Sequence, residues 1–107
     1  MVTRNNNGHR KRLRERFLQS GFEGFLDYEI IELLLTFGTP MKDCKQMSKD
    51  AINKFKTLSG VINANSDELK QINGIGDTNS IYIKIIKELN KRLSKEGVSQ
   101  NISLDSP

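Results

Sequence analysis

The sequence predicts an all-α fold, a compact helical domain of about five helices. Apolar residues recur at spacings of three and four along most of the chain, which is the periodicity of helices that bury one face. No stretch alternates apolar and polar residues as a half-buried strand does. With 107 residues, of which 36% are apolar, the chain can form one core and is too short for two ordinary domains.

The N-terminal part should form a polar arm followed by a short basic helix. Residues 1–7 are polar and precede a glycine, so we expect a flexible arm there. Residues 8–96 are expected to form the domain itself. From residue 9 to 20, Leu13 and Phe17 lie one helical turn apart. Three cations of this helix could reach neighbouring phosphates, or could simply solvate its surface: Arg10, Lys11 and Arg14.

The next two helices should supply much of the core. Asp27 is a plausible N-cap for a buried central helix, because the following residues are apolar around most of its circumference. Gly38 and Pro40 end that helix, since proline cannot continue its hydrogen-bond ladder. A new helix should start at Asp43. Its apolar face is formed by residues at spacings of three and four, namely Cys44, Met47, Ala51 and Phe55.

Two further helices are expected in the C-terminal half. A short apolar turn over residues 58–64 leads to Ser66, which can cap a helix containing Leu69 and Ile72. The last helix begins near Asp77 and is amphipathic. One broad face carries Ile81, Tyr82, Ile85, Ile86, Leu89 and Leu93, and the opposite side carries Lys84, Lys87, Lys91 and Lys95. Residues 97–107 are polar and should form a tail or linker.

The positive charge is concentrated in two places. The chain has a net charge of +4, and residues 1–20 alone hold six basic side chains against one acidic. Residues 81–95 hold five basic side chains against one acidic. Such clustering suits a polyanion better than a small ligand, although a solvated helix face is the simpler interpretation of most single lysines.

Several classes of function are excluded by what the sequence lacks. Cys44 and His9 are the only cysteine and the only histidine, too few for a disulfide or a zinc site. No nucleophile with an adjacent base can be assembled, so we expect no enzyme activity on this chain, and no catalytic or metal-ligating residue. No run of about 20 apolar residues is present, and no signal peptide is visible. We therefore expect a cytoplasmic protein with no membrane partner.

The motif that carries the function lies between the last two helices and reads Asn73-Gly74-Ile75-Gly76-Asp77. Its two glycines should let the backbone turn tightly with positive φ while Ile75 points inward. The turn then exposes consecutive N–H groups at the positive end of a helix dipole, which makes a phosphate site without a charged side chain. Thr78 can add a hydroxyl contact, and the small Ser80 lets the helices approach closely.

A Gly-x-Gly pattern alone is also compatible with an ordinary helix connection. A dinucleotide site is excluded because no strand precedes the glycines and no third glycine follows, and no Gly-Lys-Ser/Thr phosphate loop exists. Together with its flanking residues, the motif resembles the helix-hairpin-helix family: Leu69, Ile72, Ile75, Ser80, Ile83 and Lys84. The resemblance implies binding of a sugar-phosphate backbone without sequence preference. It also implies that the hairpin carbonyls can hold a monovalent cation, the only cofactor expected.

A longer resemblance covers nearly the whole chain. Residues 8–17, 27–35 and 58–61, together with the hairpin, resemble the N-terminal region of the RadC family. Members are named as DNA-repair proteins and normally continue into a JAB/MPN metalloprotease-like domain with zinc ligands that this chain lacks. The resemblance implies that residues 102–107 begin the link to that domain. It further suggests that residues 38–42 form a degenerate first hairpin, although an ordinary turn is equally compatible because Pro40 removes a donor.

Two hypotheses follow. The first is a sequence-nonspecific DNA-binding module that contacts DNA through Gly74, Ile75, Gly76, Thr78, Lys84, Arg10, Lys11 and Arg14. The second is a protein-interaction or regulatory module for a JAB/MPN-type domain not present in this chain. The acidic residues Glu29 and Glu32 would suit DNA poorly, and a sizeable exposed apolar patch would favour docking.

Overall fold

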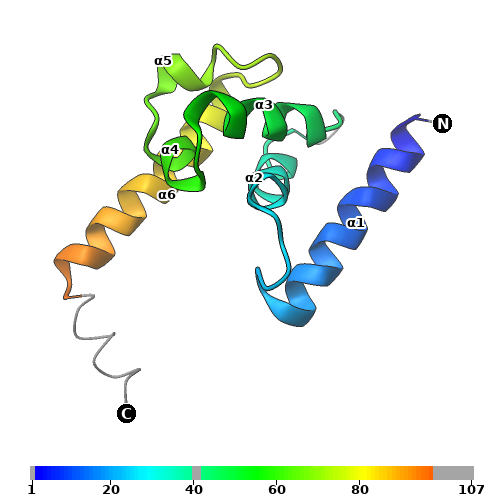
Figure 1. The fold of residues 1–107 in the computed structure, drawn as a ribbon, viewed down its shortest axis with the longest axis horizontal. Coiled ribbons are helices and arrows are strands. Elements are labelled where there is room, and N and C mark those ends of the chain that lie inside the picture. The colour runs from blue at the N-terminus through cyan, green and yellow to red at the C-terminus, as the bar shows by residue number, and fades with distance from the viewer. Residues whose placement is uncertain (1, 40–41, 98–107) are drawn as a thin grey trace.

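The computed structural model of the chain describes residues 2–39 and 42–97, with side chains from residue 8 onward. The described residues form six helices and no strand (Figure 1). The helices are α1 (Val2–Ser20), α2 (Asp27–Thr36), α3 (Lys45–Phe55), α4 (Leu58–Asn63), α5 (Ser66–Leu69) and α6 (Asp77–Lys95). The predicted all-α class is confirmed. The structure has one helix more than the five expected. The additional helix is α4, which the sequence indicated only as a short apolar turn.

The core forms where α2 meets α3 and α4, and α6 closes it from the other side. The predicted central position of α2 is confirmed, since Ile31 and Leu35 are fully buried and α2 contacts α1, α3 and α4. The predicted inner face of α3 is also buried, with Cys44, Met47 and Ala51 in one cluster. Ile83 extends this cluster from α6. Burial raises the pKa of the Cys44 thiol above its ordinary value, as expected for an inert core cysteine.

Several helix ends differ from the sequence-based expectation. α1 begins at Val2 and not at residue 9, so the backbone of residues 2–7 is helical. Leu26, not Asp27, is the N-cap of α2, and the side chain of Glu29 accepts a hydrogen bond from the Leu26 amide at 2.9 Å. At α2, a local hydrogen bond that reaches back one turn decides the boundary, and composition does not reveal it.

The start of α5 is shifted for the same reason. Asn65, and not Ser66, is the N-cap of this helix. The Asn65 side chain accepts from the Glu68 amide at 2.8 Å, and the Glu68 side chain accepts from the Asn65 amide at 3.4 Å. This reciprocal capping box satisfies amides at the helix start that would otherwise lack partners. The helix then ends at Leu69, so Ile72 lies in the connection to α6 and not in the helix.

The broad apolar face of α6 does not point into the core. Ile81, Ile85 and Leu89 are each more than half exposed, whereas Ser80 and Ile83 on another face are buried. The connection before α6 fixes this rotation. Ile75 is already in the core, so the residues one and two helical turns after it, Asn79 and Ile83, also face inward and are buried. In Figure 1, α1 and α6 lie on opposite sides of the molecule, with α2 between them.

Candidate functional site

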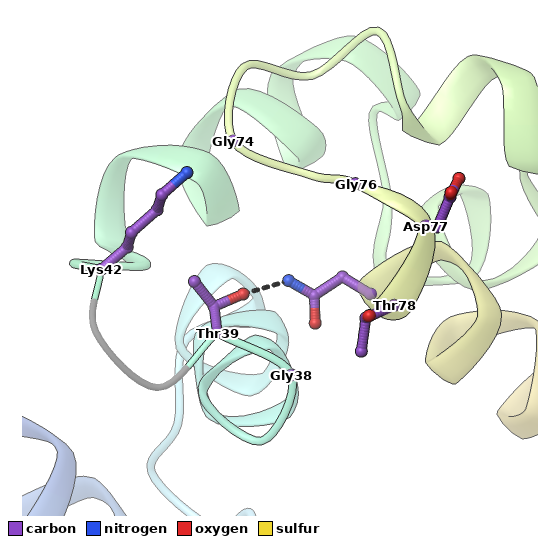
Figure 2. A pocket seen from close by; sticks show the side chains of 8 residues that line it. Gly38, Thr39, Lys42, Gly74, Gly76, Asp77 and Thr78 are labelled. Atoms are coloured by element: carbon purple, nitrogen blue, oxygen red, sulfur yellow. Dashed lines mark hydrogen bonds between the residues drawn. The ribbon is translucent and has the colours of Figure 1, made fainter.

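A pocket of about 330 Å³ lies between two glycine-containing turns (Figure 2). One turn follows α2 and contributes Gly38, Thr39 and Lys42. The other turn precedes α6 and contributes Gly74 and Gly76, and the first turn of α6 contributes Asp77, Thr78 and Asn79. The two turns are far apart in sequence, so only the tertiary fold brings them to one site.

The two glycines of the second turn have different structural roles. Gly74 has a φ of 98°, and a Cβ built there would lie 2.7 Å from Met47 Sδ, so both the backbone and the packing require glycine. Gly76 has a φ of −112°, and a Cβ there would meet nothing within 4 Å. The prediction of positive φ is therefore confirmed at Gly74 and wrong at Gly76. The predicted inward position of Ile75 is confirmed, since it is 5% exposed.

The start of α6 offers unpaired donors to this pocket. In the described part of the chain, no backbone hydrogen bond is donated by Gly76, Asp77, Thr78 or Asn79, and Ser80 is the first amide that bonds back, to the Gly76 carbonyl at 3.0 Å. Unpaired N–H groups at the first turn of a helix carry partial positive charge. They line a space that an anion could enter, and the exposed Thr78 lies beside them as expected.

The charges near the pocket partly oppose one another. Lys42 lines the pocket and adds a cation that the sequence analysis did not single out. Asp77 is exposed at the pocket edge, where its carboxylate accepts a hydrogen bond from Lys70 at 3.0 Å. This contact raises the pKa of Lys70. The Asp77 carboxylate interacts favourably with the dipole of α6, but it would repel an incoming phosphate.

Asn79 connects the two turns. Its side chain is 2% exposed and donates a hydrogen bond to the Thr39 hydroxyl, drawn as a dashed line in Figure 2. The Asn79 Oδ1 atom has no hydrogen-bond partner among the described residues. It lies so close to Gly38 that a Cβ there would be 2.0 Å away. Gly38 is thus required by close packing, and the turn after α2 is held against the start of α6.

Arg10 is not an exposed cation, contrary to its predicted phosphate contact. It is 7% exposed, and its guanidinium donates to the carbonyls of Thr36 at 3.0 Å and of Thr39 and Lys42. Its five donors suit the carbonyls left unpaired where a helix ends. Arg10 therefore fixes the turn after α2 to α1. Pro40, whose missing donor supported an ordinary turn over a degenerate hairpin at residues 38–42, lies outside the described residues, and the hypothesis of a degenerate hairpin stays a prediction.

The other predicted cations lie away from the pocket. Lys11 is exposed on α1, and the Arg14 guanidinium lies 4.7 Å from the centre of the Phe37 ring. Lys84 is exposed further along α6, beside Ile81 and Ile85. The structure thus brings Gly74, Gly76 and Thr78 together and leaves Lys84, Lys11 and Arg14 outside. Gly38, Thr39 and Lys42 lie in the segment that the family resemblance suggested as a first hairpin, whereas Asn79 is a lining residue that the sequence analysis did not identify.

The acidic residues of α2 are occupied by internal contacts. Glu32 is 1% exposed, and its Oε2 lies 2.7 Å from His9 Nε2. Burial raises the pKa of Glu32, and the contact with His9 counteracts that shift. Glu29 pairs with Arg16 at 3.1 Å, which lowers the pKa of Glu29. Glu32 therefore presents no charge at the surface that could repel DNA, because its side chain is buried.

Comparisons with known proteins cover most of the chain. The family model described as UPF0758 N-terminal matches residues 6–81. A UPF0758 protein of Fusobacterium nucleatum is 40% identical over 105 residues, which is 98% of this chain and 45% of that protein. A UPF0758 protein of Ruegeria pomeroyi is 32% identical over 98 residues, which is 92% of this chain and 44% of that protein. The chain therefore spans less than half of these relatives. No solved structure matches it.

Proposed function

Because the chain belongs to the UPF0758 family, and its sequence is that of the RadC-family N-terminal region, we propose that it binds the sugar-phosphate backbone of DNA without reading base sequence. The binding site in this proposal is the pocket between the turn after α2 and the start of α6. One phosphate group occupies the pocket and accepts hydrogen bonds from the amides at the start of α6.

The observation that carries the proposal is the set of unpaired amides of residues 76–79 at an open pocket. A phosphate oxygen can accept several such hydrogen bonds at once, and charge-assisted bonds of this kind are stronger than neutral ones. Lys42 lies at the same pocket and supplies a compensating charge. Backbone amides make the same contact with every nucleotide, so the site positions DNA and does not discriminate between bases.

The rest of the chain supplies the weaker, longer-range part of the interaction. Lys11, Lys84 and Lys95 are exposed, and the molecule carries a net charge of +4. Each phosphate that such a side chain neutralises releases counterions, so the affinity should fall as the salt concentration rises. The monovalent cation expected at the hairpin carbonyls remains a prediction and is not needed for this contact.

A binding titration tests the proposal. Fluorescence anisotropy is measured with labelled duplex, single-stranded and branched DNA, at several salt concentrations and with two unrelated sequences of each form. We expect binding at low salt, equal affinities for the two sequences, and a linear dependence of the logarithm of the affinity on that of the salt concentration. Absence of binding to all three forms at low salt would rule the function out.

Lys42→Ala tests the location of the site, and Lys54→Ala is its matched control. Lys54 is an exposed lysine in the last turn of α3, and it does not line the pocket. The Lys42 variant should lose several-fold in affinity and reduce the salt slope by about one, because one phosphate contact is lost. The Lys54 variant should bind as the parent does. Equal losses in both variants would show that DNA contacts the whole charged surface and not the pocket.

A second candidate is the interaction module, and one observation favours it. Apolar side chains of α1 and α6 are exposed away from the pocket, as a docking surface requires. The relatives are more than twice as long as the part that this chain matches, so a docking role toward a JAB/MPN-type domain would concern those longer proteins. Sedimentation of the chain mixed with a full-length relative tests this candidate, and two independently migrating species would argue against it.

A further inference from the structure

Two exposed apolar features meet at Tyr82 of α6. The first is a groove of about 440 Å³ between the end of α1, α2 and Tyr82, whose apolar walls include Phe17, Leu18, Phe22 and Phe37. The second is a stripe along α6 formed by every fourth residue, Ile81, Ile85, Leu89 and Leu93. We name the groove and the stripe together the apolar surface. It shares no residue with the pocket between the turns.

Several large apolar side chains of this surface are exposed. Leu18 is 82% exposed, Phe37 is 57% exposed, and the four stripe residues are between 43% and 57% exposed. Single exposed apolar residues are ordinary, but a contiguous set on two elements marks an interaction site. The stripe spans about 18 Å along the helix axis at 1.5 Å per residue, a length that another helix can cover.

The charges around the apolar surface indicate the chemistry of its partner. Arg14 lines the groove and Lys84 lies beside the stripe, while Lys11 of α1 and Arg92 of α6 are further exposed cations on the same two helices. None of these four cations forms an ion pair with a described residue. Glu88 lies among them, but Lys91 already pairs with it at 3.5 Å. The rim therefore carries more positive than negative charge.

Three other occupants fit the apolar surface less well. A second copy of the chain would bring Lys84 and Arg92 against the same cations of the partner, and like charges at an interface are costly. The phosphates of a nucleic acid could pair with the cations of the rim. The stripe, however, offers only aliphatic side chains, on which bases cannot stack as they do on aromatic rings. A lipid surface is flat and would not fill a recessed groove, whereas a single large side chain of a docked helix can enter it.

We propose that the apolar surface is a docking site for an amphipathic helix of a protein partner that carries acidic residues beside its apolar face. Its apolar side chains lie along the α6 stripe, and one large apolar side chain enters the groove beside Phe37. Its carboxylates pair with Arg14, Lys84 and Arg92. The apolar surface and the phosphate pocket share no lining residue, and only exposed cations such as Lys84 would serve both partners.

The test uses two synthetic helical peptides of about 18 residues, long enough for five turns. Both carry leucines at spacings of three and four. The acidic peptide has glutamates beside the leucines, and the control peptide has lysines there. Binding to the whole chain is measured by fluorescence anisotropy, and the contact surface is mapped by amide chemical shifts. We expect the acidic peptide to bind at least ten-fold more tightly and to shift the amides of α6 and the end of α1.

Surface variants then locate the contact. Phe37→Ser and Ile85→Ser remove apolar contact area at exposed positions, so the fold should persist. Each variant should bind the acidic peptide about ten-fold more weakly than the parent does. Asn53→Ser, at an exposed position of α3, is the matched control and should leave the peptide affinity unchanged. The affinity of Ile85→Ser for DNA should also be unchanged. A variant that no longer binds the peptide but binds DNA as the parent does separates the two functions.

Three outcomes would overturn the proposal. The first is equal affinity for the acidic and basic peptides, or no binding of either. The second is binding to vesicles of phosphatidylserine and phosphatidylcholine in the absence of peptide binding, which would make the surface a membrane contact. The third is a concentration-dependent dimer in sedimentation that Ile85→Ser abolishes, which would assign the stripe to a second copy.

Discussion

Replacing Gly76 with valine separates binding from folding at the pocket. Gly76 has an ordinary extended φ of −112°, and a Cβ there meets no atom within 4 Å. A β-branched residue is well tolerated in extended backbone, so the variant should fold with an unchanged melting temperature. Its two methyl groups, however, would project at the pocket where the proposed phosphate lies.

The size of the expected loss follows from the hydrogen bonds that the phosphate would form. Each charge-assisted bond from an amide contributes about 1.5–3 kcal/mol, and about 1.4 kcal/mol corresponds to a ten-fold change in affinity. Loss of one such bond should therefore weaken DNA binding roughly ten- to one-hundred-fold. The salt slope should remain nearly that of the parent, because the lost donors are neutral amides and the charged side chains are retained.

Lys95→Ala provides the contrasting case. Lys95 is exposed in the last turn of α6, at the other end of that helix from the pocket. Its loss should lower the affinity modestly and reduce the salt slope by at most about one. Anisotropy titrations at several salt concentrations, with circular dichroism of each variant, measure both effects. A folded Gly76→Val protein that binds DNA as tightly as the parent would refute the proposed phosphate site.

Three further predictions concern the stability and electrostatics of the same region. Gly74→Ala should lower the free energy of unfolding by about 2–4 kcal/mol in a denaturant titration, through a positive φ of 98° and a clash with Met47; an unchanged midpoint would contradict it. His9→Ala should cost about 1–3 kcal/mol at pH 7, because it leaves the Glu32 carboxylate buried without its partner. Since burial raises the pKa of Glu32, that loss should be full above the raised pKa and disappear as the pH falls below the ordinary value of 4.5, where the carboxyl is protonated in both states; a pH-independent difference would exclude this cause. Asp77→Asn should strengthen DNA binding about two- to five-fold at low salt by removing a like charge from the pocket edge, and weaker binding would show that the carboxylate supports the site.

The fold could be predicted well from the sequence because its main determinants are local. The spacing of Cys44, Met47 and Ala51 defined the inner face of α3, and all three are buried. The start of α6 at Asp77 and the inward position of Ile75 also followed from the glycine pattern. Errors arose where a side chain reaches back to an earlier amide, as Glu68 does at Asn65, because a composition-based cap assignment does not see that contact.

The candidate site could be predicted only in part. Gly74, Gly76 and Thr78 lie within one short segment, so their proximity is guaranteed by the chain. Arg10 illustrates the opposite case. Its place in a basic helix indicated an exposed cation, but the turn after α2 offers it carbonyls without other partners, and it is buried there. Whether a basic residue faces solvent or satisfies a helix end depends on which segment lies against it.

The sequence by itself determined the all-α class and the place of the glycine-containing turn before α6, since each depends on residues close together in the chain. Only the tertiary structure decided the rotation of α6 and which segment lies against the glycine-containing turn before it. The strongest apolar face of α6 is exposed, because packing of Ile75 and Ile83 into the core fixes which side turns inward. The pocket likewise exists because Asn79 packs against Gly38 and bonds to Thr39. Periodicity measures how apolar each helix face is, but the preceding turn determines which face is buried.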